Sequence, residues 1–315
     1  WQVEMGALKQ GEVVALVNYM SQILVELVKL ANLIITVTKA IACGNRIEEV
    51  LELPVDIVKE AAEVKEEYKG AVAFENVTFA YHKDAEPAIE NISFVAKKGE
   101  TIGIIGGTGS GKSTLVNMLP ALYRPTEGKI YIDGKNVNAY EEQELKEKIG
   151  MVMQKAVLFK GTIADNLKFG KEDVTEEDMW QALSMAQAKE FVEQKEGGLS
   201  YVINEGGKNL SGGQKQRLTI ARALVKKPEI LVLDDSASAL DYATDAALRK
   251  ALKETGENQI TFIVSQRAAS IMHADQIIVL DEGEMVGLGT HGELLKKCQV
   301  YKEIYDSQFR GEAAV

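Results

Sequence analysis

The sequence has few cysteines, few prolines and no excess of positive charge. Two cysteines among 315 residues cannot make a disulfide framework, which indicates a reducing compartment. Lys and Arg number 36 against 47 Asp and Glu, and the resulting net charge of −11 argues against a broad nucleic-acid-binding surface. The chain begins at Trp1 without a secretory signal pattern, so we expect it to be part of a longer chain. Its length favours two domains, and a hydrophobic content of 46% with only five prolines is typical of a globular protein.

One long apolar stretch lies near the N-terminus, at residues 12–42, and contains neither proline nor glycine. As a single helix it would be ~46 Å long, enough to span the apolar core of a bilayer. Its polar side chains fall on one helical stripe, which consists of Asn18, Gln22, Glu26, Lys29, Asn32 and Thr36. The segment is therefore either an amphipathic helix of a soluble domain or a membrane helix whose stripe faces a bundle interior or an aqueous path.

The composition changes twice after this stretch. Residues 46–69 are charged and helix-forming, which is typical of a solvated linker. From Ala71 onward, short β-branched runs alternate with helical segments, and this pattern predicts an α/β domain. The expected strands are AVAFENVTFAY, AIENISFVA, ETIGIIG, KIYID, IGMVM, EILVLD, QITFIV and QIIVLD.

A phosphate-binding loop is present at residues 106–113, with the sequence GGTGSGKS. It fits G-x-x-x-x-G-K-[ST], follows an apolar run and precedes a helical segment, which is the context that this motif requires. Its glycines let backbone N–H groups converge on a nucleotide phosphate, and the following helix N-terminus favours the negative charge. Lys112 is expected to bridge the β- and γ-phosphates, and the Ser113 hydroxyl is expected to ligate Mg²⁺.

Two further segments strengthen the prediction of a nucleotide site. Residues 230–234 predict a buried parallel strand that ends in the carboxylate of Asp234, which a P-loop protein needs near Mg²⁺. Such a run alone is usually just a strand leaving the core, so its weight depends on the loop upstream. The pentapeptide LSGGQ at 210–214 opens a helical segment, where small residues form a second anion-binding helix N-terminus. It is too specific to be an ordinary helix start.

With these motifs in order, the sequence resembles the ABC transporters of the exporter type, which fuse a membrane domain to an ATPase domain. The resemblance implies nucleotide contacts at Tyr81, at the Walker A residues Gly106, Gly107, Thr108, Gly109, Ser110, Gly111, Lys112, Ser113 and Thr114, at the signature residues Ser211, Gly212, Gly213 and Gln214, and at Asp241. It implies Mg²⁺ ligands at Ser113, Gln154 and Asp234. Glu205 and Gly207 match the exporter loop before the signature, and the segment that starts at Ser238 matches a loop at the family's dimer interface.

The resemblance also implies an architecture and partners. The expected fold is an α/β P-loop ATPase domain with an antiparallel β subdomain near Tyr81 and a helical subdomain around 140–225, preceded by the last helix of an all-α transmembrane domain. Residues 1–52 would end that membrane domain, 53–70 would be a linker and 71–315 the nucleotide-binding domain. ATP and Mg²⁺ are the implied cofactors. The implied partners are a second half-transporter, the lipid bilayer of the cell membrane and a transported small molecule or peptide, with the ATPase domain in the cytoplasm and no nucleic acid bound.

Two positions depart from the family pattern, and both concern attack on the γ-phosphate. The family's catalytic positions correspond here to Asp235, Gln266 and Gln154. Asp235 stands where a Glu is expected, so its carboxylate is withdrawn by roughly 1–1.5 Å, a misplacement that costs on the order of 100-fold in rate. Gln266 stands where the switch histidine is expected and cannot carry a proton or a positive charge.

The motifs therefore favour a degenerate half of a heterodimeric exporter, in which this chain's own ATP site hydrolyses poorly and its intact signature completes the partner's site. Two alternatives stay open. One is a homodimeric exporter that hydrolyses ATP at both sites despite Asp235 and Gln266. The other is a soluble ABC ATPase, which the apolar segment at 12–42 and the acidic charge balance disfavour.

Overall fold

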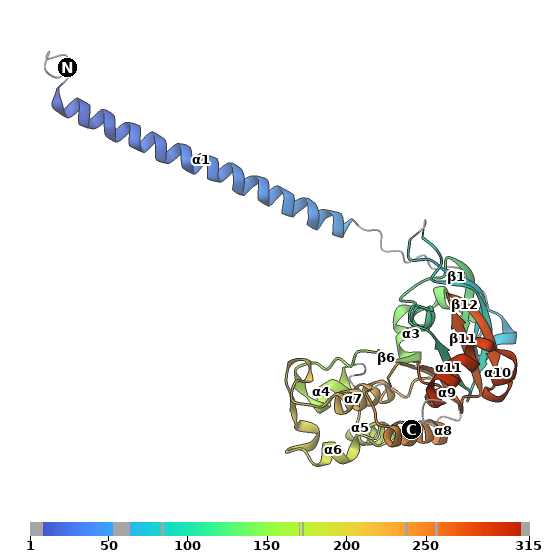
Figure 1. Ribbon diagram of the computed structural model, residues 1–315. Coiled ribbons are helices and arrows are strands. Elements are labelled where there is room, and N and C mark those ends of the chain that lie inside the picture. Colours follow the sequence, from blue (N-terminus) through green and yellow to red (C-terminus); the bar gives the residue numbers. More distant parts are fainter. Residues whose placement is uncertain are drawn as a thin grey trace. The chain divides into compact units, whose positions relative to one another are not determined.

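A computed structural model describes residues 9–52, 64–82, 85–169, 171, 173–236, 239–255 and 258–309. These residues belong to two compact units, one formed by the helix α1 and one that begins at Val64 (Figure 1). The linker expected at 53–70 lies largely outside the described residues, and so does Ser238 of the expected dimer-interface loop.

The first unit is the helix α1, Gln10–Leu51, of 42 residues. It is longer than the expected segment 12–42, because it includes Gly11 and continues through Gly44. A single interior glycine costs only ~1 kcal/mol relative to alanine, which a long helix tolerates. With a mean hydropathy of 1.6 over its most apolar window, α1 is long and apolar enough to cross a membrane, judged by length and composition alone. Within its polar stripe, Lys29 and Glu26 form an ion pair at 2.7 Å.

The second unit is built around a six-stranded sheet in the order β12–β11–β3–β10–β9–β6. The strands are β3 Thr101–Gly106, β6 Ile149–Val152, β9 Ile230–Asp234, β10 Ile260–Val264, β11 Gln276–Asp281 and β12 Glu284–Gly289. Five of them are parallel, and only β12 runs antiparallel, beside β11. The strands β9 and β10 are buried along their whole length, which explains why they are apolar except for Asp234 at the end of β9 and Thr261 within β10. The expected strands of this sheet are confirmed, and β12 was not expected.

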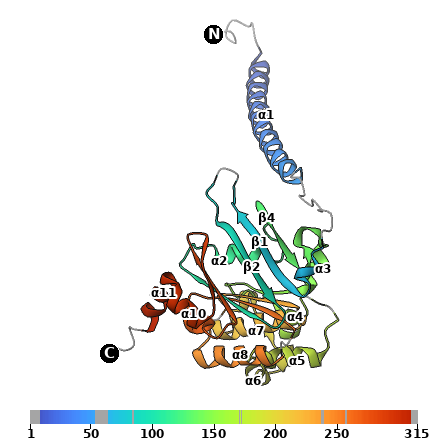
Figure 2. The same cartoon turned by 90° about the vertical axis from the view of Figure 1, so that its right-hand side faces the viewer.

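An antiparallel sheet lies against the central one, in the order β2–β1–β4–β5 (Figure 2). Its strands are β1 Ala71–Phe79, β2 Ile89–Lys97, β4 Glu127–Ile132 and β5 Lys135–Asn136. Phe74 of β1 stacks on Phe94 of β2 with ring centroids 4.6 Å apart, and Phe94 in turn contacts Phe262 of β10 at 6.4 Å. These buried rings join the two sheets through one hydrophobic core.

Helices cover the rest of the unit, and a group of them forms the expected helical subdomain (Figure 1). The helices are α2 Lys112–Asn117, α3 Glu142–Lys148, α4 Ile163–Lys168, α5 Glu176–Met185, α6 Lys189–Glu193, α7 Gly212–Leu224, α8 Tyr242–Thr255, α9 Ala268–Ile271, α10 His291–Lys297 and α11 Gln299–Phe309. A two-stranded sheet pairs β7 Gly161–Thr162, directly before α4, with β8 Val202–Ile203, between α6 and α7. The subdomain expected at 140–225 is thus present, except that β6 within this range belongs to the central sheet.

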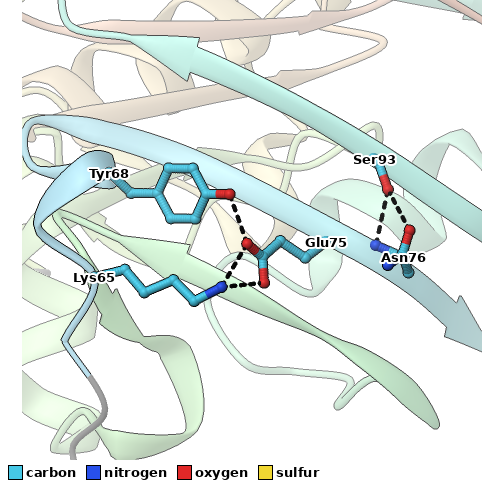
Figure 3. Close-up of polar contacts among 5 residues, drawn as sticks. All are labelled: Lys65, Tyr68, Glu75, Asn76 and Ser93. Carbon is cyan, nitrogen blue, oxygen red and sulfur yellow. Dashed lines mark hydrogen bonds and ion pairs between the residues drawn. The ribbon is translucent and has the colours of Figure 1, made fainter.

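The segment before β1 is fastened to the antiparallel sheet by a charged cluster (Figure 3). Lys65 donates to both carboxylate oxygens of Glu75 at 2.6 Å, and the Tyr68 hydroxyl donates to the same carboxylate at 2.5 Å. Burial acts to raise the pKa of Glu75, but the hydrogen bonds from Lys65 and Tyr68 outweigh it and hold the pKa below its ordinary value. Beside this cluster, Ser93 and Asn76 form a neutral pair of hydrogen bonds.

The lowered pKa predicts a pH-dependent contribution of Glu75 to stability. Its contribution is present above the unfolded-state pKa, near 4.5, and is lost as the pH falls through the lower folded-state value. We expect Glu75→Gln to lower the unfolding temperature by roughly 2–4 °C at neutral pH. The difference from the natural chain should shrink in acid, measured by thermal unfolding between neutral pH and pH ~3.5.

Ser93→Ala is the matched control, because it removes an uncharged pair from the same sheet, and its effect should not change with pH. A pH-independent effect of Glu75→Gln would contradict the assignment of the carboxylate as the stabilising group.

Candidate nucleotide-binding site

The loop between β3 and α2 wraps around the side chain of its own lysine. Lys112 is only 8% exposed, and its ammonium group donates to the carbonyl oxygen of Gly106 at 2.9 Å and to that of Gly107. It also lies 3.3 Å from the Ser110 hydroxyl. The loop therefore holds the ammonium group of Lys112 at the N-terminus of α2, among backbone carbonyl oxygens of the loop itself.

Gly111 has a backbone conformation that this loop requires. Its φ is +92°, and it is the residue immediately before α2. A Cβ atom at this position would lie 2.5 Å from Cγ2 of Ile89 and 2.6 Å from the carbonyl oxygen of Ala88. The loop thus approaches the start of β2 closely enough to exclude any side chain.

The parallel strands bring acidic groups to the same edge of the sheet. Asp234 ends β9 beside Val264 of β10, and its carboxylate accepts a hydrogen bond from Ser113 at 3.2 Å. Asp235 follows with φ +45°, and its carboxylate accepts a hydrogen bond from the Gln154 amide at 3.2 Å. Gln154 reaches this edge because it follows β6, which pairs with β9.

The charges in this region are only partly compensated. Burial lowers the pKa of Lys112, while the nearby carboxylates of Asp234 and Asp235 act to raise it. Burial also raises the pKa of Asp234, and the negative charge of Asp235 adds to this effect. A bound polyphosphate would favour the charged lysine, and a bound divalent cation would favour the ionised Asp234.

The oxygen atoms here suit a hard cation. Asp234 is 4% exposed, and Ser113 and Gln154 lie beside the acidic pair. Among the described residues, no group of three or more His, Cys, Asp or Glu side chains forms a protein-only metal site. The carboxylate of Asp234 and the neighbouring oxygen atoms are donors of the kind that hold Mg²⁺ together with substrate phosphates.

An aromatic ring borders the same region. Tyr81 follows β1, is 52% exposed, and its hydroxyl shares a hydrogen bond of 2.8 Å with Thr114. Edge-to-face contacts with Phe79 at 4.9 Å and with Tyr123 at 5.4 Å fix the ring. Tyr123 was missed in the sequence analysis, because it lies in an irregular segment without hydropathic periodicity.

These groups line one cleft of about 370 Å³. The predicted residues on its wall are Tyr81, Thr108, Gly109, Gly111, Lys112, Ser113, Thr114, Gln154, Asp234, Asp235 and Gln266. Ala88, Val264 and Ser265 complete the lining and had not been predicted as site residues. Gly106, Gly107 and Ser110 belong to the same loop but do not line the cleft.

The signature residues and Asp241 lie outside this cleft. Ser211 caps α7 by accepting from the Gln214 backbone N–H at 3.3 Å, while the Gln214 side chain accepts from the Ser211 N–H at 3.1 Å. A Cβ atom on Gly213 would lie 3.2 Å from the Ala239 carbonyl oxygen, which places this turn near the segment before α8. Hydrogen bonds from the Thr244 backbone and hydroxyl hold the pKa of Asp241 below its ordinary value.

Comparison with known proteins gives a result that is consistent with a nucleotide-binding cleft. Residues 89–238 match the protein family described as ABC transporter. The uncharacterized ABC transporter ATP-binding protein YfiB of Bacillus subtilis is 43% identical over 314 residues, which are 100% of this chain and 54% of YfiB. An ATP-dependent lipid A-core flippase of Idiomarina loihiensis is 36% identical over 310 residues, 98% of this chain and 53% of the flippase.

A solved structure agrees in fold as well. The structure of a bacterial Atm1-family ABC exporter with ATP bound superposes with a TM-score of 0.79 at 30% identity, covering 87% of this chain and 48% of that chain. This chain carries the ATP-binding domain of an ABC transporter. It corresponds to the C-terminal half of the exporter type and spans about half the length of the curated relatives that it matches.

Within this ABC domain, the two unusual residues Asp235 and Gln266 occupy one cleft with Lys112. Gln266 lies in the short loop between β10 and α9, and its side chain is exposed. Both departures from the family pattern therefore lie on the wall that the P-loop lysine also lines.

Two glycine substitutions in the P-loop of the ABC domain should differ sharply in their effect on the free energy of unfolding. Gly111→Ala forces a side chain into a left-handed conformation and against Ile89 and Ala88, so we expect it to lower the free energy of unfolding by more than about 1 kcal/mol. Gly107→Ala should leave stability within about 0.5 kcal/mol, because its Cβ atom meets nothing within 4 Å and its φ is not positive. Denaturant unfolding of the two variants tests this, and equal losses would contradict it.

Proposed function

We propose that this chain is the ATPase portion of a membrane exporter. Residues 1–52 end its transmembrane domain, 53–70 are a linker, and 71–315 are the nucleotide-binding domain. The observation that carries the proposal is the single cleft in which Lys112, Asp234 and Gln154 meet. The length and hydropathy of α1 support a membrane location, and the similarity to an ABC exporter over 87% of this chain supports the transport function.

The cleft supports a specific role for each group. Lys112 neutralises the β- and γ-phosphates of ATP, and Tyr81 offers its exposed face to the adenine. Ser113, Asp234 and Gln154 would hold Mg²⁺, which supplies positive charge at the phosphates when bound. Gln154 also adjoins Asp235, so its position depends on the residue that would orient the attacking water.

In this proposal, a second chain completes the nucleotide site of this chain. Ser211–Gln214 and Asp241 carry family signature positions, yet they do not line the cleft of their own chain. A partner half-transporter would supply its signature to this cleft and receive the signature of this chain in return. ATP-driven closure of the two domains would then be relayed through the Gln154 region to the membrane domains, moving a small molecule or peptide.

We further propose that this chain's own site hydrolyses ATP poorly, so that the exporter is a heterodimer. The support is that both departures, Asp235 and Gln266, line the cleft beside Lys112, whereas the signature is complete. Groups that act as a unit in catalysis lose function together. The competing function is a homodimer that is active at both sites, which is favoured by the presence of a carboxylate at position 235 within the cleft.

Restoring the family residues tests the degenerate site directly. The full-length protein without a partner should bind ATP with little turnover, while the double variant Asp235→Glu, Gln266→His should gain turnover by about 100-fold. Both proteins should bind ATP, which serves as the control. Brisk turnover by the natural protein alone would instead establish the homodimer.

The signature and the acidic pair should behave differently in the two-chain complex. Ser211→Arg should abolish ATPase activity, because it removes the α7 cap and places a bulky cation where the partner's nucleotide would bind. Asp235→Asn should change the activity of the complex by less than about twofold, since the partner's site carries the turnover. Steady-state phosphate release measures both, and a large loss in Asp235→Asn would refute the degenerate-site proposal.

A further inference from the structure

The loop that carries Gln266 is held by a side chain from the last helix of the described chain. Gln308 of α11 donates from its amide nitrogen to the Gln266 carbonyl oxygen at 2.7 Å. Its amide oxygen accepts from the Ala268 backbone N–H at 2.8 Å. One side chain thus satisfies two backbone groups on either side of Arg267, in the way that a neighbouring strand would.

The helix α11 is itself firmly packed, so it can act as a fixed support. Tyr301 is fully buried, and its hydroxyl shares a hydrogen bond of 2.7 Å with Nδ1 of His291. Tyr305 lies 5.2 Å from the His291 ring and stacks on Phe309 at 4.5 Å. Gln308 therefore extends from a helix that aromatic contacts on both sides of it in sequence hold in place.

The other contacts of the loop fix its two ends rather than Gln266. The Ser265 backbone N–H donates to the Ile104 carbonyl oxygen at 3.0 Å, which ties the loop to β3. The Arg267 backbone N–H donates to the Ser265 hydroxyl at 2.9 Å. The carbonyl of Gln266 is bonded to Gln308, so this contact holds the backbone of a residue that lines the cleft.

We infer that Gln308 is a positioning residue that orients Gln266 toward the γ-phosphate of ATP. The inference rests on the proposed function, because it requires ATP in the cleft. ADP lacks the γ-phosphate, so a misplaced Gln266 should weaken the binding of a triphosphate and leave the binding of ADP unchanged. A purely structural role for Gln308 would instead weaken both nucleotides or lower stability.

The test compares the affinities of ADP and of a non-hydrolysable ATP analogue, AMP-PNP, for the full-length protein with Mg²⁺. Gln308→Ala should lower the preference for AMP-PNP over ADP by about three- to tenfold, the change expected from one hydrogen bond. Gln308→Glu should do the same, because it still accepts from Ala268 but cannot donate to Gln266. Combining Gln308→Ala with Gln266→Ala should add nothing to the effect of Gln266→Ala alone, since both act through one side chain.

Gln299→Ala is the matched control, because Gln299 is on the same helix and its amide bonds to Glu303 of that helix. Its nucleotide preference should equal that of the natural protein. An unchanged preference in Gln308→Ala, or an equal loss for both nucleotides, would overturn the inference. Failure of the natural protein to bind either nucleotide would overturn the proposed function instead.

Discussion

The parallel pairing of β3, β10 and β9 is the constraint on which the site depends. Val264 of β10 pairs with Ile104 on one side and with Asp234 on the other, so β9 and β10 end together and β3 continues by two residues to Gly106. Because the side of a parallel sheet at the carboxyl ends of its strands receives every following loop, the P-loop, the acidic pair and the Gln266 loop meet at one edge. Leu280 of β11 pairs with Gly106, and its carbonyl oxygen would lie 2.1 Å from a Cβ atom there. The P-loop therefore turns where the neighbouring strand leaves room for glycine alone.

The same edge concentrates charges that the protein does not balance by itself. Burial lowers the pKa of Lys112 and raises that of Asp234, so each group is held in conditions that disfavour its charged form. In a structural ion pair, the pKa of the lysine would be raised and the pKa of the carboxyl group would be lowered. Perturbed groups of this kind cluster at functional sites, where a ligand supplies the missing charge. Here a bound polyphosphate would stabilise the charged form of Lys112, and a bound divalent cation would stabilise the charged form of Asp234.

Much of this arrangement could be predicted from the sequence, because the signals were local. The buried strands β9 and β10 are predominantly apolar runs, and the P-loop has fixed spacing between Gly106 and Lys112. The strand β12 was not predictable in this way, because it is glycine-containing and half-exposed along its length. Glycines flank the apolar segment 12–42 in the sequence, whereas the helix α1 includes Gly11 and runs through Gly44.

The contacts of Tyr123 and Gln308 were beyond sequence reasoning for a different reason. Gln308 is 42 residues from Gln266, and nothing in the local pattern of an amphipathic helix distinguishes it from other exposed glutamines. Gln308 reaches Gln266 only because α11 packs against α9, β3 and β11. Local pattern thus predicts which elements form, and tertiary packing decides which polar side chains meet.

The signature residues lie outside the cleft of their own chain. One chain could therefore hydrolyse ATP poorly in its own cleft and still complete the site of a partner with its signature. The α7 cap depends on Ser211 and Gln214 alone, whereas the cleft depends on strand ends that include Asp235. A shorter side chain at position 235 would alter the wall of the cleft, whereas the hydrogen bonds that cap α7 do not involve Asp235. In the proposed heterodimer, each chain would therefore contribute a cleft and a signature that different contacts hold in place. These separate contacts are the physical condition under which a single competent site could power transport by two chains.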